Sequence, residues 1–124
     1  MNFAELPLTV LKFGGTSVAG PERMRHVAQI VKKVRDSGYR VAVVVSAMGN
    51  MTDDLLALAK DVANTNNGRE MDQLLATGEQ QSVALLALAL QKFGLAAQSF
   101  TALQAGIKAE GFPMEGRIYS IEPK

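Results

Sequence analysis

Two apolar strands separated by a helix dominate the first third of the sequence, and they constrain the fold most. Leu8–Phe13 and Val41–Val45 are rich in strand-forming residues. The second run is continuously apolar, which predicts a strand buried on both faces of a parallel sheet. Between them, Pro21 begins a segment with helical periodicity that Gly38 ends. Strand, helix and strand in this order predict a right-handed crossover and a parallel sheet with helices on its faces.

The rest of the chain predicts further helices and two more strands. A helix is expected from near Thr52, a second and strongly apolar one up to Phe93, a third strand over Ala96–Phe100 and a short fourth over Arg117–Ile121. No repeat or linker divides the sequence. We therefore expect an α/β fold in which residues 1–124 belong to one domain, without a second.

Composition excludes several classes of function. The 124 residues carry 13 basic and 12 acidic side chains, a formal net charge of +1, so no electrostatic surface for nucleic acid is expected. The absence of cysteine excludes disulfides and thiolate metal sites. No secretory signal is recognisable. The longest apolar run, Val83–Leu90, is too short for a membrane span of ~20 residues. These features predict a soluble, cytoplasmic protein that does not bind membranes.

Polar segments follow each of the first three predicted strands. They are Lys12–Ser17, Ser46–Thr52 and Thr101–Ile107. Ligands of open α/β sheets bind at the carboxyl ends of the strands. We therefore expect a ligand site where these three segments meet.

The first of these segments has the chemistry of a phosphate site. Gly14 and Gly15 allow close approach of the backbone to a polyanion and offer unhindered amide donors. Lys12 precedes them and can place an ammonium group against the same phosphates, with a helix N-terminus following. The order of residues differs from a Walker A loop and from G-x-G-x-x-G. The alternative is a strand-to-helix turn that needs glycine only for its shape.

Two further residues are weaker candidates when read alone. Glu79 follows Gly78 inside a long helical stretch, where glycine indicates a kink or a close backbone approach. Its carboxylate can bind an ammonium group, although a solvent-facing glutamate is the alternative. Thr52 fits a helix N-cap, and a helix N-terminus is itself a carboxylate site. Asp53 and Asp54 diverge on a helix, so we predict no metal site.

In combination, the segments resemble aspartate kinase, a member of the amino-acid kinase superfamily. The matching pieces stand in family order and spacing up to about Ile107. They are Val10–Val18, Val45–Leu56, Leu74–Gln80, and Ser99–Thr101 with Gln104–Ile107. The resemblance implies a three-layer α/β/α fold with a mostly parallel sheet, present here as its N-terminal half. It also implies transfer of a phosphoryl group from ATP, with Mg²⁺, to the side chain of L-aspartate, giving 4-phospho-L-aspartate.

The resemblance also assigns roles to individual residues. Lys12 corresponds to the lysine that contacts the transferring phosphate, within a phosphate-binding turn that includes Phe13, Gly14 and Gly15. The positions that hold aspartate in the family match Thr52 and Glu79, with Ser46 at the same edge as a further candidate. Magnesium is expected to arrive bound to the nucleotide, without ligands from this chain.

Two departures from the family pattern leave alternatives open. Lys108–Met114 replaces a family loop that usually carries Thr-Asp and a histidine. The family's second half, with much of the nucleotide site, is absent, so we expect this chain alone to be inactive and to self-associate or to form homo-oligomers. The alternatives are a related kinase acting on glutamate, acetylglutamate, carbamate or a nucleoside monophosphate, and a non-catalytic assembly module with half a kinase fold.

Overall fold

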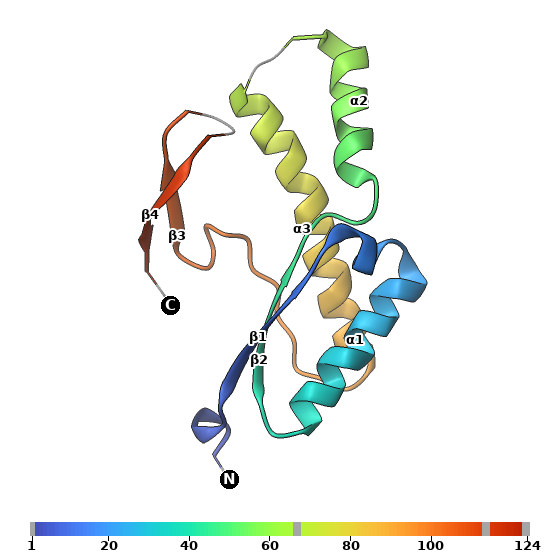
Figure 1. Ribbon diagram of the computed structural model, residues 1–124, viewed down its shortest axis with the longest axis vertical. Helices are drawn as coiled ribbons and strands as arrows, with labels where there is room; N and C mark the ends of the chain where they lie inside the picture. Colours follow the sequence, from blue (N-terminus) through green and yellow to red (C-terminus); the bar gives the residue numbers. More distant parts are fainter. Residues whose placement is uncertain (1, 66–67, 113–114, 123–124) are drawn as a thin grey trace.

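A computed structural model describes residues 2–65, 68–112 and 115–122 (Figure 1). The strands are β1 (Leu8–Phe13), β2 (Arg40–Val45), β3 (Ile107–Glu110) and β4 (Arg117–Ile121), and the α-helices are α1 (Pro21–Asp36), α2 (Met51–Ala63) and α3 (Gly68–Lys92). Two short 3-10 turns lie at Phe3–Glu5 and Gly15–Val18. Within the described ranges, no helix combines the length and apolarity that crossing a membrane requires.

The first two strands pair in parallel, and α1 connects them. The register runs from Leu8 opposite Arg40 to Phe13 opposite Val45. Pro21 occupies the first turn of α1, and Gly38 follows the helix with φ of 100°, as expected of a left-handed stop. The predicted strand–helix–strand unit and its parallel pairing are therefore confirmed.

The hydrophobic core lies between this sheet and two helices. Met24, Val27 and Val31 from α1 are buried against Leu86 and Leu90 from α3. Alternate residues of the two strands pack onto this cluster, among them Leu11, Phe13, Val41, Val43 and Val45. Side chains alternate between the two faces of a strand. Both helices therefore cover one face of the β1–β2 pair.

The opposite face of the same sheet is exposed. Leu8, Val10 and Val44 are 58%, 63% and 51% exposed. The prediction that the second strand is buried on both faces is therefore wrong for this chain. Strand β2 has apolar side chains on both faces, but within the described residues only the face toward α1 and α3 is covered. Lys12 projects from the same exposed side of β1.

Helices α2 and α3 form an antiparallel pair above the end of the sheet (Figure 1). Asn64 adopts left-handed geometry, with φ of 39°, at the end of α2. Gly78 does not interrupt the helix, since α3 runs without a gap from Gly68 to Lys92. The helix continues because Gly78 is buried in a helix contact, where its missing side chain is needed for packing.

The C-terminal third differs most from expectation. The predicted third strand, residues 96–100, is not a strand, although its side chains alternate between exposed and half-buried. Ala97 packs on the core, and Figure 1 shows the segment leading from α3 to β3. Strand assignment requires a partner ladder, and the described strands pair only as β1 with β2 and β3 with β4. The antiparallel β3–β4 hairpin confirms Arg117–Ile121 as a strand and adds an unpredicted one at Ile107–Glu110.

Candidate active site at the ends of the first two strands

The glycine turn begins where β1 ends. Phe13 points into the core, whereas Lys12 is exposed. Gly14 has ordinary extended geometry, with φ of −75° and ψ of 173°, and nothing lies within 4 Å of the position that a Cβ would take. A short 3-10 turn follows from Gly15, and α1 begins only at Pro21. The helix therefore begins at Pro21, as predicted, and a 3-10 turn whose first amides have no acceptor within it separates it from the glycines.

The turns after β1 and β2 are locked together by backbone contacts. The amide of Gly49 donates to the Gly15 carbonyl oxygen at 2.9 Å, and the Ser46 amide donates to the Phe13 oxygen at 3.2 Å. A Cβ on Gly15 would lie only 2.8 Å from the carbonyl oxygen of Ala47. Glycine at position 15 is therefore required for the approach of the second turn. The prediction that these two polar segments meet at one edge of the sheet is confirmed.

The first turn of α2 extends this edge. Asn50 is the N-cap residue and Met51 the first helical residue, so Thr52 lies within the helix and the prediction that it is the cap is wrong. The cap lies two residues earlier than predicted, after a turn in which the Met51 amide donates to the carbonyl oxygen of Met48. Thr52 is exposed in the first turn, whose acidic side chains suit the positive end of the helix. The expected helix N-terminus is thus present.

Helix α3 brings Glu79 to the same region through its neighbour Gly78. A Cβ on Gly78 would lie 3.0 Å from Cγ of Met51 and 3.4 Å from Cβ of Ala47. The backbone of α3 therefore lies directly against the start of α2 and the turn after β2. Glu79 itself is exposed, as is Thr52, and Ser46 is half-buried. Three of the four segments that the sequence indicated therefore meet here: the turn after β1, the turn after β2 with the start of α2, and the middle of α3. The fourth, after residue 100, does not.

The Thr101–Ile107 segment is bonded to the C-terminal hairpin instead of to this edge. Its last turn closes on the hairpin, because the Glu122 amide donates to the carbonyl oxygen of Gly106 at 2.8 Å. Gly106 has φ of 81° and no space for a side chain beside Glu122. The expectation that this segment follows a strand is wrong. Of the unusual loop at 108–114, residues 113–114 lie outside the described ranges, and 107–110 form β3.

Ala47 is the residue at the centre of the site that the sequence analysis did not single out. It is 7% exposed, with its carbonyl against Gly15 and its methyl group against Gly78. The sequence carries no signal for this role, because only the fold brings Gly15 and Gly78 against the same alanine.

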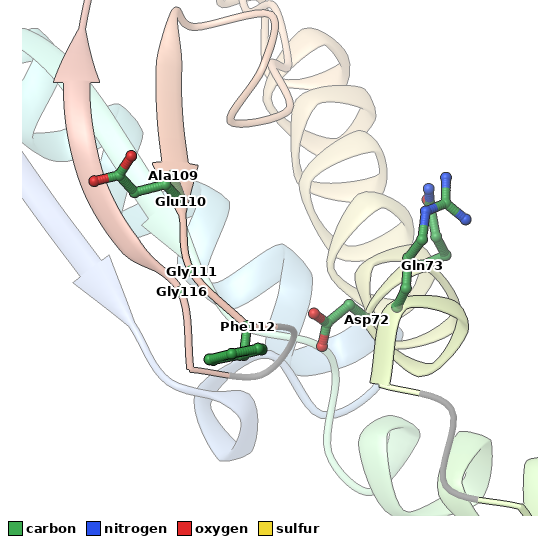
Figure 2. A pocket seen from close by; sticks show the side chains of 8 residues that line it. Asp72, Gln73, Ala109, Glu110, Gly111, Phe112 and Gly116 are labelled. Carbon is green, nitrogen blue, oxygen red and sulfur yellow. The ribbon is translucent and has the colours of Figure 1, made fainter.

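Two hollows lie near this edge, and the second is lined in part by Gly49, Asn50 and Met51 of the edge itself. One, of about 350 Å³, separates the start of α3 from the hairpin and is lined by Asp72, Gln73 and Phe112 among others (Figure 2). The other, of about 520 Å³, lies between the starts of α1 and α2 and is lined by Met24, Met48 and other residues. Neither includes Lys12 or Glu79, so the candidate site is an open edge. Among the described residues, no group of three potential metal ligands occurs.

The arrangement suits binding of an anion beside an ammonium group. Lys12 supplies a positive charge at the strand end, and the adjoining glycine turn supplies backbone amides. Glu79 supplies a carboxylate on a neighbouring element. The Lys12 ammonium and the backbone amides are suited to a phosphate group, and the Glu79 carboxylate is suited to an amino group.

Comparison with known proteins places the chain in a family. Residues 7–124 match the amino acid kinase family. This chain belongs to the amino acid kinase family. An aspartokinase of Geobacillus stearothermophilus is 50% identical over 115 residues, which are 93% of this chain and 28% of that protein. The aspartokinase of Thermus thermophilus is 48% identical over 118 residues, 95% of this chain and 29% of its own length.

Solved structures agree with this assignment. Aspartate kinase from Synechocystis matches with a TM-score of 0.76 and 50% identity over 81% of this chain and 17% of its own. E. coli aspartokinase III in complex with aspartate and ADP matches with a TM-score of 0.67 over 95% of this chain and 35% of its own. At 22% identity, the second likeness supports the fold alone. The α/β class and the resemblance are confirmed, for a chain spanning less than a third of the curated relatives named above.

Proposed function

We propose that this chain is the N-terminal part of an aspartate kinase domain. In the complete enzyme, it would transfer the γ-phosphoryl group of ATP to the side-chain carboxylate of L-aspartate. The observation that carries the proposal is the packing of three separate segments around Ala47, with distances of 2.8 to 3.4 Å to the positions of absent glycine side chains. That packing joins the turn of Lys12 to the helices of Thr52 and Glu79, and the aspartokinase relatives support the substrate.

The proposed chemistry is in-line phosphoryl transfer. An aspartate carboxylate oxygen bonds to the γ-phosphorus while the bond from that phosphorus to the β,γ-bridging oxygen breaks, giving ADP and an acyl phosphate. The nucleophile is already ionised at neutral pH, given a reference pKa of ~3.9, so no general base is required. Positioning and charge neutralisation then supply most of the catalysis. The nucleotide would bring Mg²⁺ on its phosphates.

Each candidate side chain has a role in this scheme. Lys12 would neutralise charge on the transferring group, beside backbone donors of Phe13, Gly14 and Gly15. Glu79 would bind the aspartate ammonium, and Thr52 and Ser46 would bind its carboxylates. We also propose that the protein is cytoplasmic, forms homo-oligomers and contributes to the synthesis of amino acids derived from aspartate, lysine among them.

A substrate panel tests the proposal. The complete protein, with ATP and Mg²⁺, is expected to release ADP with aspartate, and hydroxylamine is expected to trap an acyl phosphate. Glutamate, acetylglutamate, carbamate and nucleoside monophosphates should give little turnover. The 124-residue chain alone should give none, because it carries only one side of the site. Preference for another acceptor would replace aspartate in the proposal, and no turnover with any acceptor would favour the non-catalytic assembly module.

A further inference from the structure

Gly78 stands where a helix is least expected to carry glycine. It lies in the interior of the 25-residue helix α3, where glycine is less favourable than alanine, yet it is buried. A side chain there would meet Cγ of Met51 at 3.0 Å, Cδ1 of Leu55 at 3.3 Å and Cβ of Ala47 at 3.4 Å. The first two distances are tighter than ordinary packing, and the third is not. The space for a methyl group is therefore taken by α2.

This contact connects the two candidate residues for the acidic substrate. Met51 is the first residue of α2 and immediately precedes Thr52. Gly78 immediately precedes Glu79 on α3. The contact between Gly78 and Met51 therefore joins the two backbone segments that carry Glu79 and Thr52.

We propose that Gly78 is a positioning residue for the acidic substrate. Its missing side chain lets the first turn of α2 approach α3, and this approach holds Thr52 and Glu79 at the spacing that fits aspartate. The inference rests on the proposed function. Because both tight contacts fall on α2, a methyl group at position 78 displaces α2 and leaves the turns after β1 and β2 in place.

Kinetics of the complete enzyme separate this role from a general structural one. Gly78→Ala is expected to raise the aspartate KM roughly three- to tenfold, since small displacements of binding groups are costly. The ATP KM should stay near the wild-type value, because the phosphate turn does not move. Adding Met51→Ala removes the nearer of the two α2 side chains that the new methyl group meets, so the double variant should recover part of the aspartate affinity.

Thermal unfolding tests the contact without relying on activity. At an unobstructed helix position, replacing glycine with alanine raises Tm. Gly78→Ala is expected to lower Tm in the wild-type background and to raise it in the Met51→Ala background, a sign change that reports direct coupling. Ala84→Gly, at an exposed position of the same helix, is the matched control. It should lower Tm in both backgrounds and leave the aspartate KM unchanged.

The outcomes distinguish this inference from the proposed function. A wild-type enzyme that does not phosphorylate aspartate would contradict the proposed function. A wild-type enzyme that uses aspartate, with an unchanged aspartate KM in Gly78→Ala, would overturn the positioning role alone. An equal rise of Tm on Gly78→Ala in both backgrounds would overturn the contact on which that role depends.

Discussion

Two adjacent glycines in the turn after β1 serve different purposes. Gly15 lies against the Ala47 carbonyl oxygen, 2.8 Å from where its Cβ would be, so no side chain fits without moving backbone. Gly14 has open space around it and a φ of −75°, which any residue adopts. The structure of the chain therefore requires glycine at position 15 and not at position 14. We propose that glycine at position 14 serves the close approach of a phosphate group.

Paired alanine substitutions test this difference. Gly15→Ala is expected to destabilise the complete protein by about 1–3 kcal/mol, the usual cost of overpacking a filled space. Gly14→Ala should change the free energy of unfolding by no more than about 0.5 kcal/mol, while weakening ATP binding. Thermal unfolding with and without ATP measures both effects. Equal destabilisation by the two variants would contradict the division of purposes.

Among the secondary-structure elements, those with strong local signals were predictable. Pro21, Gly38 and the apolar periodicity between them define α1, and the strands on either side follow from their β-branched residues. Pairing depends on distant partners, which is why residues 96–100 looked like a strand without becoming one. The β3 strand was missed because Ile107–Glu110 is short and half polar, and its partner ladder with β4 is what stabilises it.

The candidate site was also predictable only where the sequence carries a strong local signal. Sequence alone indicated the glycine turn, the start of α2 and Glu79, because each combines polar chemistry with a break in an apolar pattern. The central position of Ala47 was not predictable, since an alanine after a strand has no chemistry of its own. Its importance arises from the segments that pack on it.

The exposed face of the β1–β2 sheet predicts association of the isolated chain. Val10 and Val44 are both more than half exposed on this face, and exposed apolar sheet surface promotes self-association. Light scattering on the 124-residue chain should show oligomers whose mass grows with concentration. Replacing both valines with threonine keeps the branched shape and should reduce the association. A wild-type chain that stays monomeric across the micromolar range would contradict this prediction.

At the scale of the whole molecule, the candidate site is an edge assembled from distant parts of the chain. The turn after β1, the turn after β2, the start of α2 and the middle of α3 meet there, and the helices behind them form the core. The two parts of this edge, the glycine turn with Lys12 and the helix with Glu79, are held in place by different contacts. The glycine turn after β1 is held by backbone hydrogen bonds to the turn after β2, whereas the position of Glu79 depends on how α3 packs against α2.

Steady-state kinetics of Lys12→Ala and Glu79→Gln in the complete enzyme most directly test whether Lys12 acts on the phosphoryl group and Glu79 on aspartate. Lys12→Ala should lower kcat on the order of 100-fold, because it removes a preorganised positive charge from the transition state. Glu79→Gln keeps the shape and removes the charge, so it should raise the aspartate KM and leave the ATP KM nearly unchanged. Lys33→Ala, at an exposed lysine of α1, is the control for charge alone. A Glu79→Gln enzyme that loses affinity for ATP instead of aspartate, or a Lys12→Ala enzyme with wild-type kcat, would contradict the assignment.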